Sequence, residues 1–236
     1  MSSSTRAQLK SHLRGISLGL YAADLGHLAD AAIRAGDWGC DILHFDVMDG
    51  VFVPQMTAGA GFVSALSTGA LRDVHLMVED AARAVDSYLD AGADLITVHA
   101  ESKGAVAAIS AIQAAPRAVL AGLALMPGTS LEAAKPLLDL GPDLILVLSL
   151  DPRDGAKADI PAACRRLSDL RALTQESAPL LAFDGGVTLD SIEEIAACRP
   201  DMVVSGSAIL KATDPARAFA RMAASLTEQV PPGAAT

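Results

Sequence analysis

The sequence has few aromatic residues, few cysteines and no long hydrophobic run. Only 3% of the 236 residues are aromatic, whereas 51% are apolar, so any core must be built mainly from aliphatic side chains. That apolar content is enough for a substantial core and excludes a disordered chain. No run of 18 apolar residues occurs, and the first residues form no apolar signal segment. We therefore expect a cytoplasmic protein that does not act at a membrane.

Cysteine is scarce as well as odd in number. The three cysteines, Cys40, Cys164 and Cys198, are far apart in the sequence. Such spacing is not typical of a disulfide framework, so we expect reduced thiols that serve as packing residues in a cytoplasmic setting.

Positive charge is also in deficit. The chain has 18 Lys and Arg against 28 Asp and Glu, a formal net charge of −10. This balance excludes nucleic acid and anionic membrane as partners. A small anionic substrate would need local groups, such as glycine-rich backbone amides, a metal ion or an Arg.

Short apolar strands alternate with amphipathic helices along most of the chain. Strands are predicted at 16–20, 41–48, 73–78, 94–99, 119–125, 143–148, 179–184 and 201–205. Helices are predicted from Asp24 to Arg34, at 59–66, 79–91 and 105–115, from Ser130 onward, and at 160–173, 189–197 and 215–226.

Eight strand–helix units without a break in composition predict a single-domain α/β fold, the TIM (β/α)8 barrel, over residues 15–228. A doubly wound open sheet is disfavoured because no G-x-G-x-x-G follows the first strand. Residues 1–14 are polar and are expected to form an N-terminal arm or a short capping helix. Residues 229–236 are expected to form a flexible tail.

Polar side chains at strand ends are the candidates for chemistry in such a barrel. His44 and Asp46 are two residues apart on one strand, so they point to the same side. His75 and Asp184 lie at the ends of two other strands. Two imidazoles and two carboxylates suit Zn²⁺, Mn²⁺, Fe²⁺ or Co²⁺. The alternative is that these groups form separate hydrogen bonds beside the core.

Two glycine-containing turns follow the seventh and eighth predicted strands. They are Asp184-Gly185-Gly186-Val187 and Ser205-Gly206-Ser207. Barrel enzymes bind phosphate at this place through backbone N–H groups, which glycine leaves accessible. Tight turns without a ligand are the alternative.

Six motifs belong together: His44-Phe-Asp46-Val-Met48-Asp-Gly-Val-Phe-Val-Pro54, Asp73-Val-His75-Leu-Met77-Val78, Ala93-Asp-Leu-Ile-Thr-Val-His99-Ala-Glu101, Pro127-Gly-Thr129, Asp184-Gly-Gly-Val187 and Gly206-Ser-Ala-Ile209. They resemble the ribulose-phosphate 3-epimerase family over roughly residues 16–220.

This resemblance implies an isomerase that inverts the carbon beside the ketone of a ketose phosphate through an enediolate. It implies one divalent metal ion, with Zn²⁺ as first choice, held by His44, Asp46, His75 and Asp184. Asp46 and Asp184 would be the acid/base pair on opposite faces of the substrate. The expected substrate and phosphate contacts are His75, Met48, Met77, Gly155, Gly185, Gly186, Gly206 and Ser207.

The sequence departs from the family at several substrate-facing positions. Gly19 replaces a serine of the first strand, Gln55 and Met126 replace asparagines, and Leu148 replaces a methionine. The glycine-rich capping loop reads Asp151-Pro-Arg-Asp-Gly-Ala-Lys157, in which Arg153 or Lys157 could bind an anion or be plain surface charges.

These departures leave open a different sugar phosphate or sugar acid as substrate, or a non-catalytic metabolite-binding barrel. A related sugar-phosphate decarboxylase is disfavoured because Asp46-Val-Met-Asp49 lacks the required lysine. His99 is either a partner of a metal ligand or a core histidine, and a homo-oligomer is compatible with the sequence.

Overall fold

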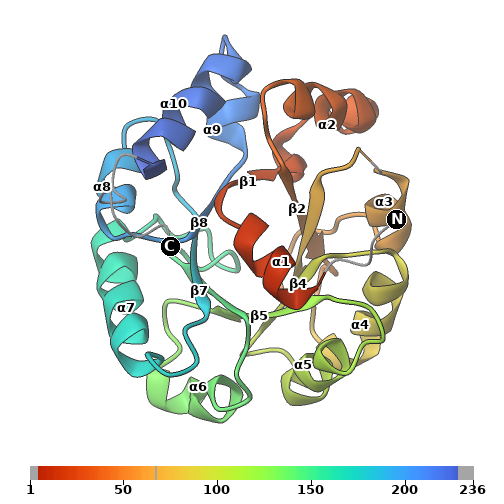
Figure 1. The fold of residues 1–236 in the computed structure, drawn as a ribbon, viewed down its shortest axis with the longest axis vertical. Helices are drawn as coiled ribbons and strands as arrows, with labels where there is room; N and C mark the ends of the chain where they lie inside the picture. Colours follow the sequence, from red (N-terminus) through yellow and green to blue (C-terminus); the bar gives the residue numbers. More distant parts are fainter. Residues whose placement is uncertain (1–4, 67, 228–236) are drawn as a thin grey trace.

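Eight parallel strands follow one another around a closed barrel in chain order, and β1 pairs with β8 to complete the ring (Figure 1). The structure is a computed structural model that describes residues 5–66 and 68–227. The strands are β1 (Gly15–Gly19), β2 (Ile42–Met48), β3 (Leu71–Met77), β4 (Leu95–His99), β5 (Leu120–Leu125), β6 (Leu144–Leu148), β7 (Leu180–Asp184) and β8 (Met202–Ser205). The predicted TIM barrel is therefore confirmed.

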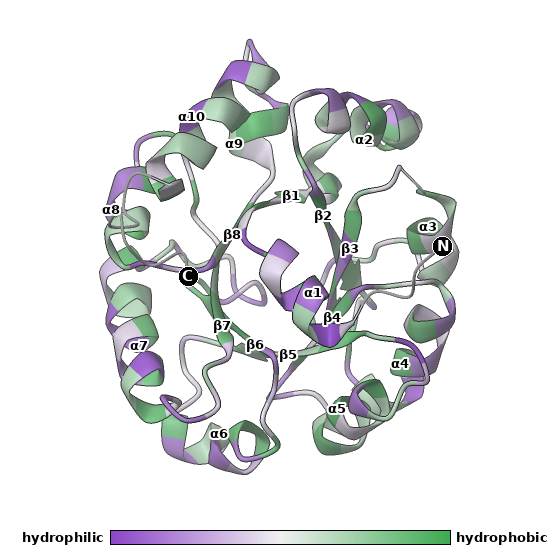
Figure 2. Cartoon of the chain, viewed as in Figure 1, coloured by the Kyte–Doolittle hydropathy of each residue, from purple (hydrophilic) through white to green (hydrophobic). Residues whose placement is uncertain are grey.

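Helices cover the outside of the barrel, and apolar residues line the strands beneath them (Figures 1 and 2). These helices are α2 (Leu28–Asp37), α3 (Ala60–Ala65), α4 (Ala81–Asp90), α5 (Ala105–Gln113), α6 (Leu131–Leu138), α7 (Ile160–Leu173), α8 (Ile192–Ala197), α9 (Ser207–Leu210) and α10 (Pro215–Thr227). Each packs an apolar stripe onto the strands, which is the arrangement that right-handed strand–helix–strand crossovers produce.

Each predicted strand and long helix has an observed counterpart. The differences are short helices of about one turn that the sequence did not predict. β1 ends at Gly19 and is followed by the 3₁₀ turn η1 (Leu20–Ala22). Asp24 caps η2 (Leu25–His27), so α2 starts at Leu28 instead of directly after Asp24. The short α9 was not predicted either. One turn of helix carries too few residues for a periodic pattern to reveal it.

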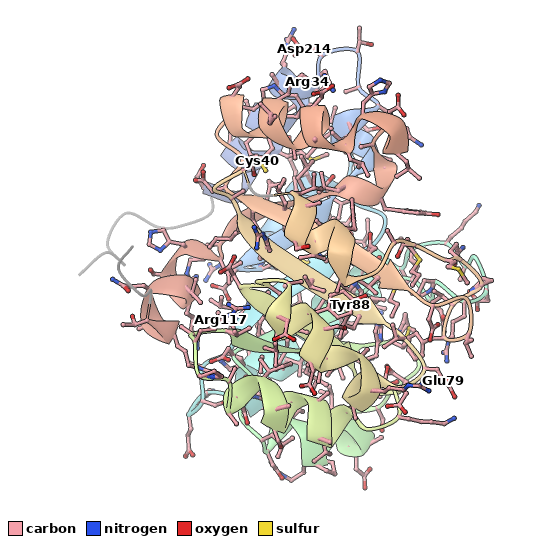
Figure 3. The ribbon with its side chains drawn as sticks, turned by 90° about the vertical axis from the view of Figure 1, so that its right-hand side faces the viewer. Arg34, Cys40, Glu79, Tyr88, Arg117 and Asp214 are labelled. Atoms are coloured by element: carbon pink, nitrogen blue, oxygen red, sulfur yellow. A yellow bond between two sulfur atoms is a disulfide. The ribbon has the colours of Figure 1, made fainter. Side chains whose placement is uncertain are left out.

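Helix α1 (Arg6–His12) closes the amino-terminal end of the barrel. Thr5 and Gln8 form a capping box at its start. Leu9 and Leu13 are buried in the cluster that fills the barrel interior. The side chain of Arg6 pairs with Asp143, which lies just before β6. In the side view of Figure 3, Arg117 before β5 lies at this end and Glu79 after β3 lies at the opposite end.

The cysteine prediction was wrong for two of the three residues. Cys164 in α7 and Cys198 at the end of α8 form a disulfide, with Cα atoms 5.5 Å apart. The two helices are neighbours on the outside of the barrel, and a separation of 34 residues gives no sign of this in the sequence. Cys40 is a buried free thiol in the described part of the chain, as the packing interpretation expected.

Two further expectations concern the ends of the chain and membranes. The predicted tail, residues 229–236, lies outside the described residues. Across residues 5–66 and 68–227, none of the helices combines the length and the apolar character that a membrane crossing requires.

Candidate active site

Four side chains from three strands meet at the carboxyl end of the barrel. His44 and Asp46 lie on β2, His75 lies on β3, and Asp184 is the last residue of β7. Each offers one nitrogen or oxygen atom, and these four atoms all lie within 4.8 Å of one another. His44 Nε2 is 3.2 Å from Asp46 Oδ1, as the strand alternation predicted. The structure thus brings the four predicted ligand residues together.

The donor atoms of this cluster suit a divalent cation. Nδ1 of His75 is buried and has no hydrogen-bond partner among the described residues. It lies 3.5 Å from Asp46 Oδ1 and 3.7 Å from Asp184 Oδ2. A buried nitrogen is seldom left unpaired, because its desolvation then costs about 1–3 kcal/mol. A cation between the imidazoles and the carboxylates would satisfy it.

The two carboxylates of the cluster differ in proton affinity. Burial raises the pKa of Asp46, but the positive charge and hydrogen bond of His44 outweigh it, so the pKa lies below the usual range. For Asp184, burial is the main cause of a raised pKa, and the neighbouring Asp46 carboxylate raises it further. Two carboxyl groups with separated proton affinities can act as an acid and a base.

Buried partners hold the other side of each histidine. His44 Nδ1 lies 2.7 Å from Asp73 Oδ2, which also accepts the Ser17 hydroxyl at 2.8 Å. Burial lowers the pKa of His44, but the carboxylates of Asp73 and Asp46 raise it well above its ordinary value. His75 Nε2 lies 2.8 Å from Nε2 of His99.

A cavity of about 350 Å³ lies beside the cluster, over the ends of β7, β8 and β1. Its lining includes four predicted phosphate contacts: Gly185, Gly186, Gly206 and Ser207. Two of these glycines are required by the packing. Gly186 has φ +63°, and a Cβ there would lie 2.3 Å from the Ala158 Cβ; a Cβ on Gly206 would lie 2.6 Å from the carbonyl oxygen of Gly19.

A second cavity of about 360 Å³ lies over the centre of the barrel and shares Asp46, Asp184 and Gly185 with the first. Its lining includes the remaining predicted substrate contacts, Met48, Met77, His75 and Gly155. Gln55 and Leu148, two of the positions that depart from the family, line it as well. The predicted site residues therefore surround one connected region at the carboxyl end of the strands.

Two residues of this region were not predicted from the sequence. Tyr21 lines both cavities and a third of about 270 Å³, because η1 turns it over the end of the barrel. Lys211 follows α9 and lines the glycine-rich cavity; it is the sole Lys or Arg among the residues that line these three cavities in the described chain. Its signal was weak, since a lysine four residues after Ser207 looks like a surface residue.

The charged residues of the loop after β6 do not line these cavities. Arg153 Nε lies 2.9 Å from Asp151 Oδ1, so its guanidinium is paired within the loop itself. Among the described residues that line the cavities, this loop contributes Leu150, Pro152, Gly155 and Ala156.

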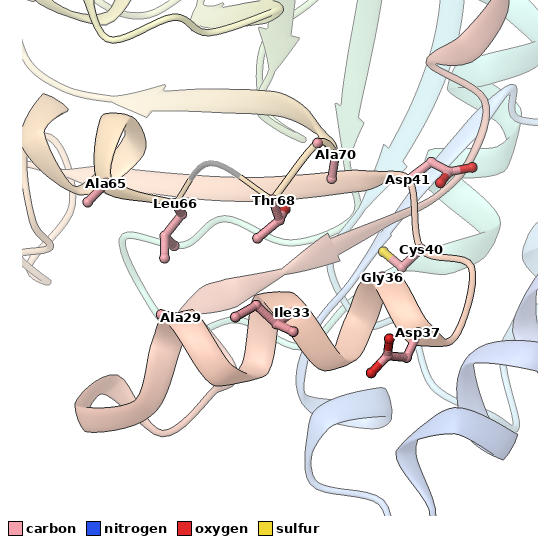
Figure 4. Close-up of a pocket in the computed structure, with 11 residues that line it drawn as sticks. Ala29, Ile33, Gly36, Asp37, Cys40, Asp41, Ala65, Leu66, Thr68 and Ala70 are labelled. Atoms are coloured by element: carbon pink, nitrogen blue, oxygen red, sulfur yellow. The ribbon is translucent and has the colours of Figure 1, made fainter.

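Another cavity, of about 600 Å³, lies near the amino-terminal ends of β2 and β3, between α2 and the segment after α3 (Figure 4). None of the four cluster residues, His44, Asp46, His75 and Asp184, lines it. Burial raises the pKa of its Cys40 thiol to about 11, so this cysteine stays protonated and unreactive near neutral pH. The chemistry of a TIM barrel is located at the opposite end.

A closed parallel barrel with a histidine–aspartate cluster and a glycine-lined cavity at the carboxyl ends of its strands defines a TIM-barrel enzyme. The model of the ribulose-phosphate 3 epimerase family matches residues 15–210. The chain therefore belongs to the ribulose-phosphate 3-epimerase family, and it is an isomerase.

Its relatives include the ribulose-phosphate 3-epimerase of Mycobacterium tuberculosis, which is 38% identical in an alignment that covers 88% of this chain and 90% of the relative. The Escherichia coli ribulose-phosphate 3-epimerase is 35% identical over 84% of this chain and 90% of its own. The chloroplastic ribulose-5-phosphate-3-epimerase of Arabidopsis thaliana is 34% identical, covering 89% and 76%.

Solved structures with a similar fold are more distant in sequence. 3-Hexulose-6-phosphate synthase from Salmonella typhimurium has a TM-score of 0.67 and 20% identity, covering 92% of this chain and all of that one. 3-Keto-L-gulonate-6-phosphate decarboxylase from Vibrio cholerae has a TM-score of 0.70 and 17% identity, covering 92% and 99%. At such identities the likeness supports the barrel fold alone.

Proposed function

We propose that this protein interconverts the two epimers of a ketose phosphate of the ribulose 5-phosphate type at the carbon beside the ketone. One observation carries the proposal: Asp46 and Asp184 offer carboxylates in the same four-residue cluster, and both line the glycine-rich cavity. Relatives that share most of this chain's length are ribulose-phosphate 3-epimerases, which supports the same substrate class.

The reaction needs one group to remove a proton and another to return one on the opposite face. In this proposal Asp46 and Asp184 are these groups, and their roles exchange with the direction of the reaction. They come from β2 and β7, which β1 and β8 separate in the barrel, so a substrate between them can be approached from two sides. Met48 and Met77 would contact the reacting carbons and exclude water, since both are buried and line the central cavity.

The proposed ligands of one divalent metal ion are His44, Asp46, His75 and Asp184. When bound, the ion supplies positive charge where negative charge develops on the substrate oxygens as the enediolate forms. Zn²⁺ is our first choice, and Mn²⁺, Fe²⁺ and Co²⁺ suit the same ligands. The backbone amides of the turns at Gly185–Gly186 and Gly206–Ser207 would bind the phosphate.

Solvent exchange tests the acid/base assignment. Incubation with ribulose 5-phosphate or a related ketose phosphate in D₂O should place deuterium at the epimerised carbon. Asp46→Asn and Asp184→Asn should each lower kcat by at least about 100-fold, the usual contribution of a positioned acid or base. Asp190→Asn, an exposed aspartate, should leave kcat unchanged. Turnover without any exchange would contradict the mechanism.

Metal analysis tests the ligand assignment separately. The purified chain should contain about one divalent ion, and His44→Ala and His75→Ala should each lose most of it. His27→Ala is the matched control, because His27 is exposed and pairs only with Asp24 among the described residues. Full metal content in the first two variants would exclude them as ligands.

A second candidate is epimerisation of a different sugar phosphate or a sugar acid. Gln55, Leu148 and Gly19 line the cavities at positions where the family pattern differs, which favours altered recognition of the substrate. We take residues 15–228 as the catalytic domain. Absence of nucleic acid and membrane partners, assembly into a homo-oligomer and a cytoplasmic location remain predictions from the sequence.

A further inference from the structure

Buried polar groups extend from His75 on the side opposite the cluster of His44, Asp46 and Asp184. Nε2 of His75 lies 2.8 Å from Nε2 of His99, and Nδ1 of His99 lies 3.1 Å from Oε2 of Glu101. Both imidazoles are fully buried. A nitrogen–nitrogen distance of 2.8 Å is shorter than the contact of stacked rings, so the two rings meet edge to edge through a hydrogen bond.

Glu101 is held at the end of this chain by a backbone N–H, which can only donate, and by a hydroxyl that donates to it. Its Oε1 accepts the backbone N–H of Met126 at 3.1 Å and the hydroxyl of Thr129. Burial raises the pKa of Glu101, but the hydrogen bonds from His99 and Thr129 outweigh it and lower the pKa to about 2. Glu101 is therefore an ionised carboxylate that accepts and cannot donate.

The direction of every hydrogen bond follows from this fixed acceptor. His99 must donate its Nδ1–H to Glu101, and because a neutral imidazole carries one proton, its Nε2 is an acceptor. His75 must then donate its Nε2–H to His99. Its Nδ1 consequently carries a lone pair, and this is the buried atom that faces Asp46 and Asp184.

We propose that His99 and Glu101 are positioning residues that fix the tautomer of His75, so that Nδ1 is always available to a cation. The proposal rests on the metal site proposed above. His44, the other histidine of that site, is oriented in the same way but by a single residue, because Asp73 accepts a hydrogen bond from His44 Nδ1 directly. In both cases the orienting group comes from the next strand or just after it: β3 for His44, and β4 with Glu101 for His75.

The tautomers can be read directly from the ¹⁵N chemical shifts of the histidine rings in the full chain, before and after a chelator removes bound metal. The chain has five histidines, and the exposed His12 and His27 are assigned through His12→Gln and His27→Gln. In the metal-free chain we expect a proton on Nε2 of His75 and on Nδ1 of His99. The reverse tautomers of His75 and His99 would overturn the proposal.

Glu101→Gln provides the perturbation, because it keeps the shape of the side chain and changes one acceptor into a donor. The Met126 N–H still requires an oxygen, so the glutamine oxygen stays there and the NH₂ group faces His99 Nδ1. This orientation reverses the relay and puts a proton on His75 Nδ1. We expect His99 and His75 each to adopt the other tautomer. Metal affinity should fall about 10- to 100-fold, the usual effect of losing an orienting partner.

Glu79→Gln is the matched control, since Glu79 makes an exposed ion pair with Lys103 at the same end of the barrel. It should leave tautomers and metal affinity unchanged. Unchanged tautomers and metal affinity in Glu101→Gln would overturn the proposal. The ring chemical shifts are measured without substrate, so they test the tautomer proposal independently of the epimerase activity. Either proposal can therefore be disproved while the other holds.

Discussion

Asp46 illustrates how much of this site depends on single residues. It belongs to the four-residue cluster and lines all three cavities at the carboxyl end of the barrel. Alternation along β2 was enough to predict that it shares a side with His44, because that rule is local. A partner role was one of the two alternatives for His99, but Asp73 and Glu101 were missed. Asp73 reaches His44 from the neighbouring strand, whereas Glu101 contacts His99 two residues before it in the chain. The two-residue spacing of Asp73 and His75 was a signal that both face the interior.

Lys211 is placed to bind the phosphate of a substrate, since it lines the glycine-rich cavity. Lys211→Gln should raise KM for a phosphorylated substrate about tenfold and leave kcat nearly unchanged. A charge-assisted hydrogen bond contributes about 1.5 kcal/mol at the lower end of its range, and a bond made equally in the ground and transition states affects KM alone. Steady-state kinetics with a ketose phosphate and with inorganic phosphate as inhibitor measure both effects.

The control for Lys211 is Lys103→Gln, which removes the same charge from the same end of the molecule. Lys103 pairs with Glu79 and lines none of the three cavities. An equal rise in KM in both variants would mean that the effect is long-range electrostatics rather than contact with the phosphate.

At the scale of elements, strands and long helices were predictable and loop conformations were not. The α7 prediction, residues 160–173, matches the observed bounds because Asp159 caps the helix and Pro161 suits its first turn. The loop after β6 is different. Whether Arg153 faces a ligand or a neighbour depends on the short-range geometry of the loop, and the structure pairs it with Asp151.

Native activity on ribulose 5-phosphate should be weak, because the loop after β6 lacks two flexible glycines of the family pattern. Ala156 replaces one and lines the central cavity, and Arg153 replaces the other and is paired with Asp151. Arg153→Gly, Asp154→Phe, Ala156→Gly and Lys157→Gln together restore the family pattern around Gly155 and should raise kcat/KM for this substrate. Lys157→Gln alone, the control, should not. A native kcat/KM already near about 10⁶ M⁻¹s⁻¹ would show that the native loop is a tolerated variant.

In the whole molecule, eight strand–helix units form a barrel because eight parallel strands joined by right-handed crossovers can close into a ring. Local sequence patterns therefore predicted the architecture and which end carries the chemistry. They did not predict which helices touch on the outside. α7 and α8 pack against each other, and this contact brings Cys164 to Cys198.

The disulfide should stabilise the whole barrel, because it closes a loop of 34 residues that contains β7. Cross-linking such a loop restricts the unfolded chain, so reduction, or Cys164→Ser with Cys198→Ser, should lower the free energy of unfolding by about 2–4 kcal/mol. Urea unfolding measures this, and a reductant should not change the double variant further.

Thiol titration provides an independent check. The unfolded, unreduced chain should expose one thiol, that of Cys40, and reduction should raise the count to three. Three reactive thiols before reduction would mean that the cysteines of α7 and α8 lie close together without being bonded.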